Sequence, residues 1–220
     1  MILDKKSIAG LIPSRRIKRT IARNLFEHIM KRGEVTVLYG ARQVGKSTLI
    51  LSCLEEYCNQ GGNIFYFNLD YDLQDFITDP TEFIAYIESK KNTQNTMIFI
   101  DEAQRLENIG LFVKYIYDRK LQYKFILSGS ASLDIQSKVK EPLTGRKKEF
   151  YLGSLTLSEI LTFKGYNTEA ITGSFPQLQT ILEDYLLYGG YPQVFLSATK
   201  EDKVEKLEEI SESYVLRDLS

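Results

Sequence analysis

Residues 40 to 48 have the types and spacing of a loop that binds phosphate groups. They fit the pattern of a glycine, four variable residues and then Gly-Lys-Ser/Thr. The glycines let the backbone curl so that successive N–H groups converge on an anion. The residues that we assign to this loop are Gly40, Ala41, Arg42, Gln43, Val44, Gly45, Lys46, Ser47 and Thr48. The pattern predicts that Lys46 neutralises the β- and γ-phosphates of a nucleotide and that the Ser47 hydroxyl is a ligand of Mg²⁺.

A second segment supplies two adjacent carboxylates. The apolar run at residues 97–100 ends in Asp101 and Glu102. An acid that follows a buried strand lies at the carboxyl end of a parallel sheet, where such sheets bind ligands. We expect Asp101 to hold Mg²⁺ through water, and Glu102 to orient and deprotonate the water that attacks the γ-phosphate. This pair favours hydrolysis over transfer of the phosphate to a substrate hydroxyl.

Two further candidates lie near the ends of later strands. Ser128 or Ser130 follows an apolar strand, where a polar side chain can lie between the attacking water and the γ-phosphate. The Ser-Gly-Ser sequence is also compatible with a simple turn. Arg146 precedes the last strand, where its guanidinium could serve a neighbouring subunit as an arginine finger. An ion pair within its own chain is the alternative for Arg146.

From residue 34 onward, β-rich runs alternate with amphipathic stretches, which predicts an α/β fold with a five-stranded parallel sheet flanked by helices. The expected strands are 34–40, 63–70, 96–101, 123–129 and 148–155. The expected helices between them are 45–59, 80–90, 107–120 and 131–141. The third and fourth strands are nearly all apolar, which indicates central positions in the sheet.

The pattern becomes purely helical after Leu155. Thr156 and Glu159 have the spacing of a capping box, so a helix should begin there and run to about Gly165. Further helices are expected from Pro176 to Gly189, from near Pro192, and from near residue 202. Residues 156–220 are therefore predicted to form a small helical subdomain.

Composition limits the classes of protein that this chain can belong to. Its 220 residues are 43% hydrophobic and 26% charged, which is typical of a globular protein with a real core. No window reaches the roughly 18 apolar residues of a membrane span, and no secretion signal precedes the charged start, so we expect a cytoplasmic protein. The two cysteines lack the partners of a zinc site, and the single histidine, His28, excludes a His-rich metal centre.

The first 33 residues form a distinct basic arm. Up to Arg32 they hold nine Lys or Arg residues against two acidic ones, in a chain whose net charge is −1. Such an arm can bind nucleic acid phosphates. The alternative, which we favour, is a helix with a solvated charged face, because apolar residues recur at every fourth position from Ile17 to Ile29.

Several segments together resemble the AAA ATPase family common in bacteria and archaea. The segments are GARQVGKST, MIFIDEAQRL, ILSGSAS, LTGR, LTLSEIL and YGGYP, and the likeness runs over about residues 34–217. The resemblance implies an AAA+ type P-loop core with ATP and Mg²⁺ as ligands and a helical lid. A homo-oligomer is the assembly that an arginine finger at Arg146 would require. In this family the core precedes a C-terminal nuclease-like domain of unknown function, which would be present if the natural chain continues past Ser220.

The resulting domain prediction has three parts: a basic N-terminal helical arm at 1–33, the P-loop ATPase core at 34–155, and a helical lid with the start of a C-terminal region at 156–220. The leading functional prediction is an ATPase that is coupled to a partner domain or to nucleic acid. The alternative is a nucleotide-gated switch or scaffold with little turnover. Glu102 favours the first. The second is favoured by the lid, which departs from the AAA+ pattern because Arg217 is the only arginine after Arg146. A small-molecule kinase is disfavoured, because no acceptor-binding set of residues stands out.

Overall fold

The computed structural model describes residues 1–58, 62–71, 77–91, 95–130, 138–167 and 175–218. The chain forms two compact units. Unit 1 comprises Met1–Pro13, Arg23–Gly40 and Lys46–Tyr151. Unit 2 comprises Ser14–Ala22, Ala41–Gly45 and Leu152–Ser220. Neither unit is continuous in sequence, and the part of the basic arm from residue 14 to residue 22 belongs with the helical C-terminal residues.

Unit 1 is built on a six-stranded sheet in the order β1-β3-β4-β5-β2-β6. The strands are β1 (Ile2–Leu3), β2 (Val35–Gly40), β3 (Asn63–Asn68), β4 (Thr96–Asp101), β5 (Tyr123–Ser130) and β6 (Lys147–Tyr151). All neighbouring pairs are parallel except β1 and β3, which are antiparallel. The α/β prediction and the central positions of β4 and β5 are confirmed. The prediction of five strands was wrong, because two residues at the chain start are too short to show a strand pattern.

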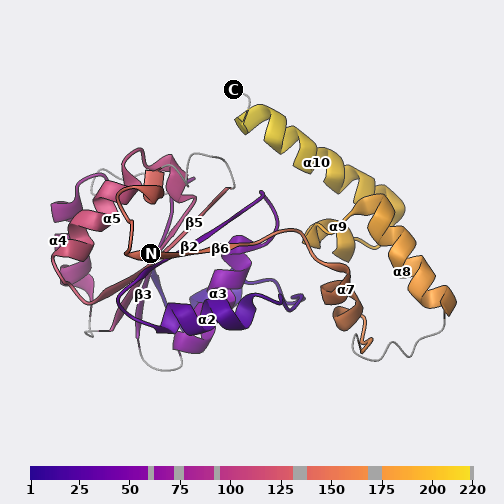
Figure 1. Cartoon of the computed structure of the whole chain (residues 1–220), viewed down its shortest axis with the longest axis horizontal. Coiled ribbons are helices and arrows are strands. Elements are labelled where there is room, and N and C mark those ends of the chain that lie inside the picture. The colour runs from indigo at the N-terminus through magenta and orange to yellow at the C-terminus, as the bar shows by residue number, and fades with distance from the viewer. Residues whose placement is uncertain (59–61, 72–76, 92–94, 131–137, 168–174, 219–220) are drawn as a thin grey trace. The chain divides into compact units, whose positions relative to one another are not determined.

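Helices cover both faces of this sheet (Figure 1). On one face lie α4 (Pro80–Lys90) and α5 (Ile109–Asp118), whose side chains share one buried cluster with alternate residues of the strands, such as Phe65 and Ile98. The other face carries α2 (Ala22–Met30) and α3 (Lys46–Cys58), and α1 (Lys5–Leu11) contacts α3. Among the described residues, both cysteines are free. The helix predicted at 131–141 falls largely on residues 131–137, which lie outside the described part of the chain.

The basic arm is not one continuous helix. The helix α2 begins at Ala22, so Ile17 and Ile21 precede it, and residues 16–19 have no regular secondary structure. Arg19 is buried rather than solvated. The four-residue spacing of the apolar residues led to the prediction of a helix with a solvated charged face, which was wrong for residues 16–19. The spacing carries no information about Arg19, which is held by contacts with residues distant in sequence.

Unit 2 contains the four predicted C-terminal helices: α7 (Leu157–Phe163), α8 (Phe175–Tyr188), α9 (Pro192–Leu196) and α10 (Lys200–Asp218). The capping box of Thr156 and Glu159 is present at the start of α7. Gly189 ends α8 with a positive φ of 71°. A Cβ on Gly190 would lie 2.2 Å from the carbonyl oxygen of Leu155, and the Leu155 N–H donates to the Gly190 carbonyl at 2.7 Å. The YGGYP segment therefore anchors the connection that leads into α7.

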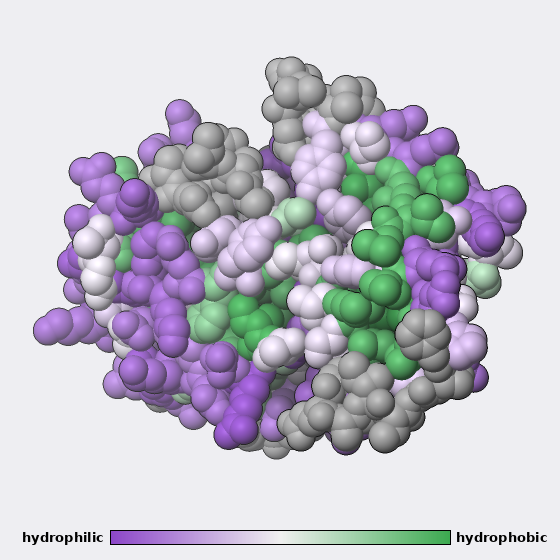
Figure 2. Space-filling model, turned by 45° about the vertical axis from the view of Figure 1, so that its right-hand side comes forward, coloured by the Kyte–Doolittle hydropathy of each residue, from purple (hydrophilic) through white to green (hydrophobic). Residues whose placement is uncertain are grey.

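The helix α8 exposes several apolar side chains. Leu182, Leu186 and the neighbouring Leu187 are exposed, as is Val204 on α10. Figure 2 shows a band of apolar side chains on its right-hand side, where the helices of unit 2 lie. In the part of the chain that the structure describes, no helix is long and apolar enough to cross a membrane.

Candidate functional site

The candidate site lies at the carboxyl edge of the unit 1 sheet. The strands β2, β4 and β5 end at Gly40, Asp101 and Ser130, and Gly40 lies opposite Ser130 in the parallel register. The strand β5 separates β4 from β2, so a side chain on β5 can reach toward the ends of both neighbours. Because these strands run in the same direction, the predicted residues at their ends share one edge of the sheet.

Lys46 is the first residue of α3, directly after the loop that follows β2. Its side chain is only 5% exposed, and its ammonium group donates to the Gly40 carbonyl at 3.0 Å. Buried apolar residues of α3, including Ile50 and Leu54, pack this helix against the rest of unit 1. This packing holds the ammonium group at the end of β2.

Asp101 is buried at the last position of β4. One carboxylate oxygen accepts hydrogen bonds from the Ser128 hydroxyl and, at 3.2 Å, from the Glu102 N–H. The other accepts from the Tyr66 hydroxyl at 3.3 Å. The three donors fix the orientation of the Asp101 carboxylate.

Glu102 adopts a left-handed backbone conformation with a φ of 53°. This region costs a non-glycine residue about 1–2 kcal/mol. Among the described residues, only Gln43, Glu102 and Lys120 combine a side chain with a positive φ, and two of these three belong to the predicted site. The Glu102 carboxylate accepts a hydrogen bond from the Gln104 side-chain amide. Strain of this kind clusters at functional sites, so it supports a specific role for Glu102.

The two candidate sensor residues differ in their surroundings. Ser128 lies beside Asp101 and donates to it, so its hydroxyl belongs to the carboxylate site. Ser130 is buried at the last position of β5, opposite Gly40. Ser130 is thus the serine that lies opposite the residue at which the loop begins.

The remaining loop residues, Ala41–Gly45, belong to unit 2. Gln43 and Gly45 have positive φ values of 59° and 94°, which curl the backbone as the sequence pattern requires. The Arg42 N–H donates to the Tyr214 hydroxyl of α10 at 3.0 Å. The Val44 carbonyl accepts from the Arg19 guanidinium at 2.9 Å.

Arg146 lies away from this site in its own chain. Its carbonyl accepts from the N–H of Val35, the first residue of β2, so Arg146 stands at the amino edge of the sheet. The parallel strand β6 that follows it is five residues long, which places roughly 16 Å of strand between the two edges. The guanidinium pairs with Asp118 at 3.3 Å and lies over the Tyr117 ring. Within one subunit, therefore, Arg146 does not join Lys46, Asp101 and Glu102.

The basic arm also divides into different environments. Arg19 forms a buried ion pair with Glu159, whereas Arg23 forms an exposed ion pair with Glu27. Arg15 lies over the Phe163 ring at 5.2 Å from its centre. Lys5, Lys6, Arg16 and Lys18 are exposed. Arg19 therefore cannot belong to a phosphate-binding surface of this arm.

Sequence reasoning missed side chains that contact the site residues, among them Tyr66, Gln104 and Tyr214. Gln104 follows Glu102 by two residues, and this proximity was the available signal. Tyr66 and Tyr214 are far from their partners in sequence, so only folding brings them there. Their hydroxyls contact Asp101 and the Arg42 N–H.

Comparisons with known proteins agree with the fold. A family model described as an AAA domain matches residues 32–161, which is more than half of the chain. The chain is 25% identical to uncharacterized protein MJ1544 of Methanocaldococcus jannaschii over 223 residues, covering 100% of this chain and 48% of the relative. The chain thus spans about half the length of this curated relative.

Two solved structures share the fold. The Walker-type ATPase PABY2304 of Pyrococcus abyssi matches with a TM-score of 0.60 and 17% identity, over 94% of this chain and 77% of that one. Hsp104 of Saccharomyces cerevisiae, solved in complex with casein in an extended conformation, matches with a TM-score of 0.59 and 13% identity, over 99% of this chain and 41% of that one.

Proposed function

The chain belongs to the AAA domain family, and from this membership we propose that it binds ATP with Mg²⁺ and hydrolyses the γ-phosphate. The single observation that carries the proposal is the shared position of Lys46, Asp101, Glu102 and Ser128 in unit 1. The buried ammonium lies where β2 ends, and the two acids lie where β4 ends. Glu102 is held there in a strained conformation.

We assign nucleotide binding to the loop at 40–48. The backbone N–H groups of the curled loop would surround the β-phosphate, and Lys46 would exchange its contact with the Gly40 carbonyl for phosphate oxygens. This exchange is favourable because the ammonium is already at the end of the loop and an anion replaces a neutral acceptor.

The donor set suits Mg²⁺ rather than a metal held by protein alone. Ser47 and Asp101 offer oxygen ligands, and Mg²⁺ is commonly bound by one or two such groups together with substrate phosphates. Among the described residues, no group of three or more His, Cys, Asp or Glu side chains could hold a metal ion. When bound, the ion would neutralise charge on the phosphates.

Glu102 is the general base in this proposal. Its carboxylate, oriented by Gln104, would take a proton from the water that attacks the γ-phosphate. Ser128 orients Asp101, and Ser130 is assigned to sense the γ-phosphate from the end of β5. The slow-switch alternative predicts binding with little turnover, so measured turnover separates the two.

Isothermal titration with ATP and Mg²⁺ tests the nucleotide site. The wild type should bind, and Lys46→Ala should lose nearly all affinity because the loop loses its phosphate-neutralising charge. Lys90→Ala is the matched control, since Lys90 is an exposed lysine at the end of α4. Equal affinity of the wild type and Lys46→Ala would contradict the nucleotide-site assignment.

We further propose that turnover is coupled to nucleic acid or to a further domain. In the AAA ATPase family that the sequence resembles, this further domain is nuclease-like. The exposed basic residues Arg15, Arg16 and Lys18 support a nucleic acid partner. Binding to DNA should then weaken steeply with salt and fall when the three are changed to Ala. A flat salt response would assign these side chains to a solvated surface.

Arg146 is proposed to act on the site of a neighbouring subunit. Arg146 lies at the amino edge of the sheet, away from the phosphate site of its own subunit. An arginine finger that acts across an interface requires such a position. Neither Arg146→Ala nor Glu102→Gln alone should be active in an assembly. Mixing the two should restore part of the turnover, because one interface then pairs an intact Glu102 with an intact Arg146. No restoration, in an assembly shown to exchange subunits, would assign Arg146 to its pair with Asp118.

A further inference from the structure

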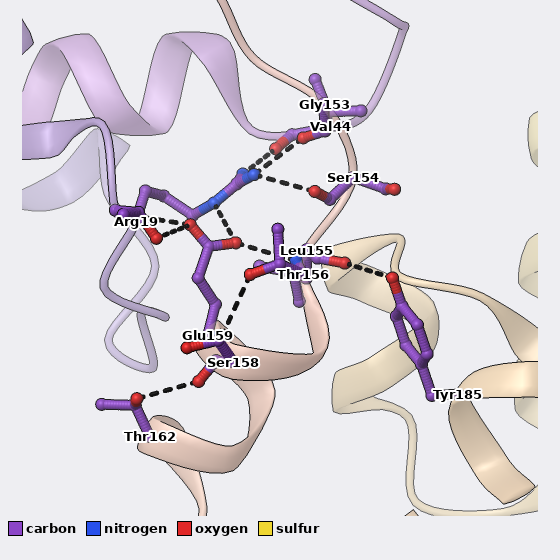
Figure 3. Close-up of polar contacts among 11 residues, drawn as sticks. Arg19, Val44, Gly153, Ser154, Leu155, Thr156, Ser158, Glu159, Thr162 and Tyr185 are labelled. Atoms are coloured by element: carbon purple, nitrogen blue, oxygen red, sulfur yellow. Dashed lines mark hydrogen bonds and ion pairs between the residues drawn. The ribbon is translucent and has the colours of Figure 1, made fainter. Parts of the chain in front are cut away.

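Arg19 joins three segments of unit 2 through one buried side chain (Figure 3). Its Nη1 donates to the Val44 carbonyl of the loop at 2.9 Å. Its Nη2 donates to the carbonyls of Gly153 and Ser154 at 2.7 and 3.2 Å, in the connection that leads to α7. Its Nε donates to Glu159 in the first turn of α7 at 3.2 Å. The side chain is 8% exposed, so these contacts replace water for nearly the whole guanidinium.

Glu159 is held as firmly as its partner. Besides Arg19, its carboxylate accepts from the N–H and hydroxyl of Thr20 at 2.7 and 3.0 Å, and from the Thr156 N–H at 3.0 Å. Burial raises the pKa of the Glu159 carboxyl, but the hydrogen bonds from Thr20 and Thr156 and the Arg19 charge outweigh it and lower the pKa. Glu159 is therefore ionised at neutral pH, and the start of α7 depends on it.

The contact with Val44 fixes more than a carbonyl. The peptide between Val44 and Gly45 is planar, so an oxygen held toward Arg19 turns the Gly45 N–H toward the opposite side. Gly45 has a φ of 94°. Because glycine has no Cβ, its backbone would rotate more freely than that of other residues without this contact. Val44 itself is fully buried, which leaves its carbonyl little freedom once Arg19 has bound it.

We infer that Arg19 is a positioning residue that orients the Gly45 N–H toward a bound phosphate and couples occupancy of the loop to the start of α7. This inference rests on the proposed nucleotide site. When phosphate binds, it favours the loop conformation in which the Val44 carbonyl contacts Arg19. The same Arg19 contact stabilises Glu159 and the amides that donate to it. By reciprocity, a loose first turn of α7 weakens nucleotide binding by the same factor.

A purely structural ion pair would not need the contact with the loop. Buried ion pairs often contribute no more stability than apolar residues of similar volume, so stability alone does not account for this one. Arg19 reaches one acceptor in the loop and three further groups near α7, which requires a planar fork with several donors. Lysine offers a charge of the same sign but only one nitrogen, which cannot span these acceptors together.

Arg19→Lys tests the positioning role by titration with Mg²⁺-ADP. The dissociation constant should rise by about 10-fold, the typical value of a lost charge-assisted hydrogen bond, while circular dichroism shows a folded protein. Arg23→Lys is the matched control, because Arg23 lies in the same arm but forms an exposed ion pair with Glu27. A folded Arg19→Lys protein with wild-type affinity would overturn the inference.

Amide exchange followed by NMR tests the coupling without relying on a variant. In the wild type, saturating Mg²⁺-ADP should slow the exchange of the Thr20 and Thr156 N–H groups, which both donate to Glu159. In Arg19→Lys this slowing should be lost. Unchanged rates in the saturated wild type would overturn the inference even if Arg19→Lys fails to fold. A wild type that does not bind Mg²⁺-ADP would overturn the proposed function instead.

Discussion

The carboxyl edge of the unit 1 sheet and the Arg19–Glu159 pair of unit 2 both bury charged side chains, and they satisfy them differently. Glu159 accepts from Thr20, Thr156 and Arg19, so its charge is balanced by the protein itself. Glu102 lies on a strained backbone at the end of β4 and is contacted by the Gln104 amide. The difference separates a carboxylate that is fully paired within the protein from one to which we assign a chemical role.

The comparison predicts that a change at Glu102 affects turnover and leaves stability nearly intact. Glu102→Gln should bind ATP normally and lower turnover by about 10²- to 10⁴-fold, the typical contribution of a positioned general base. Steady-state phosphate release and titration with ATP measure the two quantities. Glu107→Gln, an exposed acid nearby in sequence, is the control. If turnover survives in Glu102→Gln, the water must be activated by another group.

Glu159→Ala should show the opposite behaviour. Removing one partner leaves the Arg19 charge buried without its carboxylate, which typically costs about 3–5 kcal/mol of folding free energy. Urea unfolding followed by circular dichroism measures this loss. Glu27→Ala removes the partner of an exposed arginine, so it should leave stability almost unchanged.

The loss in Glu159→Ala should depend on pH with a defined sign. The pKa of Glu159 in the folded state lies below its ordinary value of 4.5, so its contribution is present above that pH and is lost on acidification. The stability difference between the wild type and Glu159→Ala should therefore shrink below about pH 4.5. A difference that stays constant through acid pH would contradict the ion pair as its source.

Gly190→Ala tests whether backbone packing, and not charge alone, holds the segment before α7. The added Cβ would lie 2.2 Å from the Leu155 carbonyl oxygen, so the backbone must move. We expect a loss of about 1–3 kcal/mol, typical of overpacking. Gly10→Ala in α1 is the control, because a Cβ there meets nothing within 4 Å. Equal thermal stability of the two variants would show that this segment relaxes freely.

Tyr214→Phe should give the smallest effect. The change removes the hydroxyl that accepts from the Arg42 N–H, and a single neutral hydrogen bond contributes about 0.5–1.5 kcal/mol. Thermal melting should show a modest decrease, with Tyr71→Phe, whose ring is exposed, as the control. A loss as large as that of Glu159→Ala would mean that α10 and the loop are as strongly linked as Arg19 and α7.

The local patterns of the sequence predicted most of the elements. The α/β fold, the central β4 and β5, the capping box at Thr156 and the helices of unit 2 follow from period, capping and turn residues, which act within a few positions along the chain. The loop at 40–48 and the acids at 101–102 were predicted for the same reason. Their roles remain proposals that the experiments above test.

What the sequence could not determine depends on contacts between distant residues. Two residues at the chain start become a sixth strand because they pair with β3. Arg19 resembles its basic neighbours in sequence, yet it is buried because Glu159, Val44 and two carbonyls meet around it. Such an arrangement has no periodicity to detect. Residue types and spacing predicted the loop, whereas tertiary packing decided that Arg19 is the arginine that contacts it.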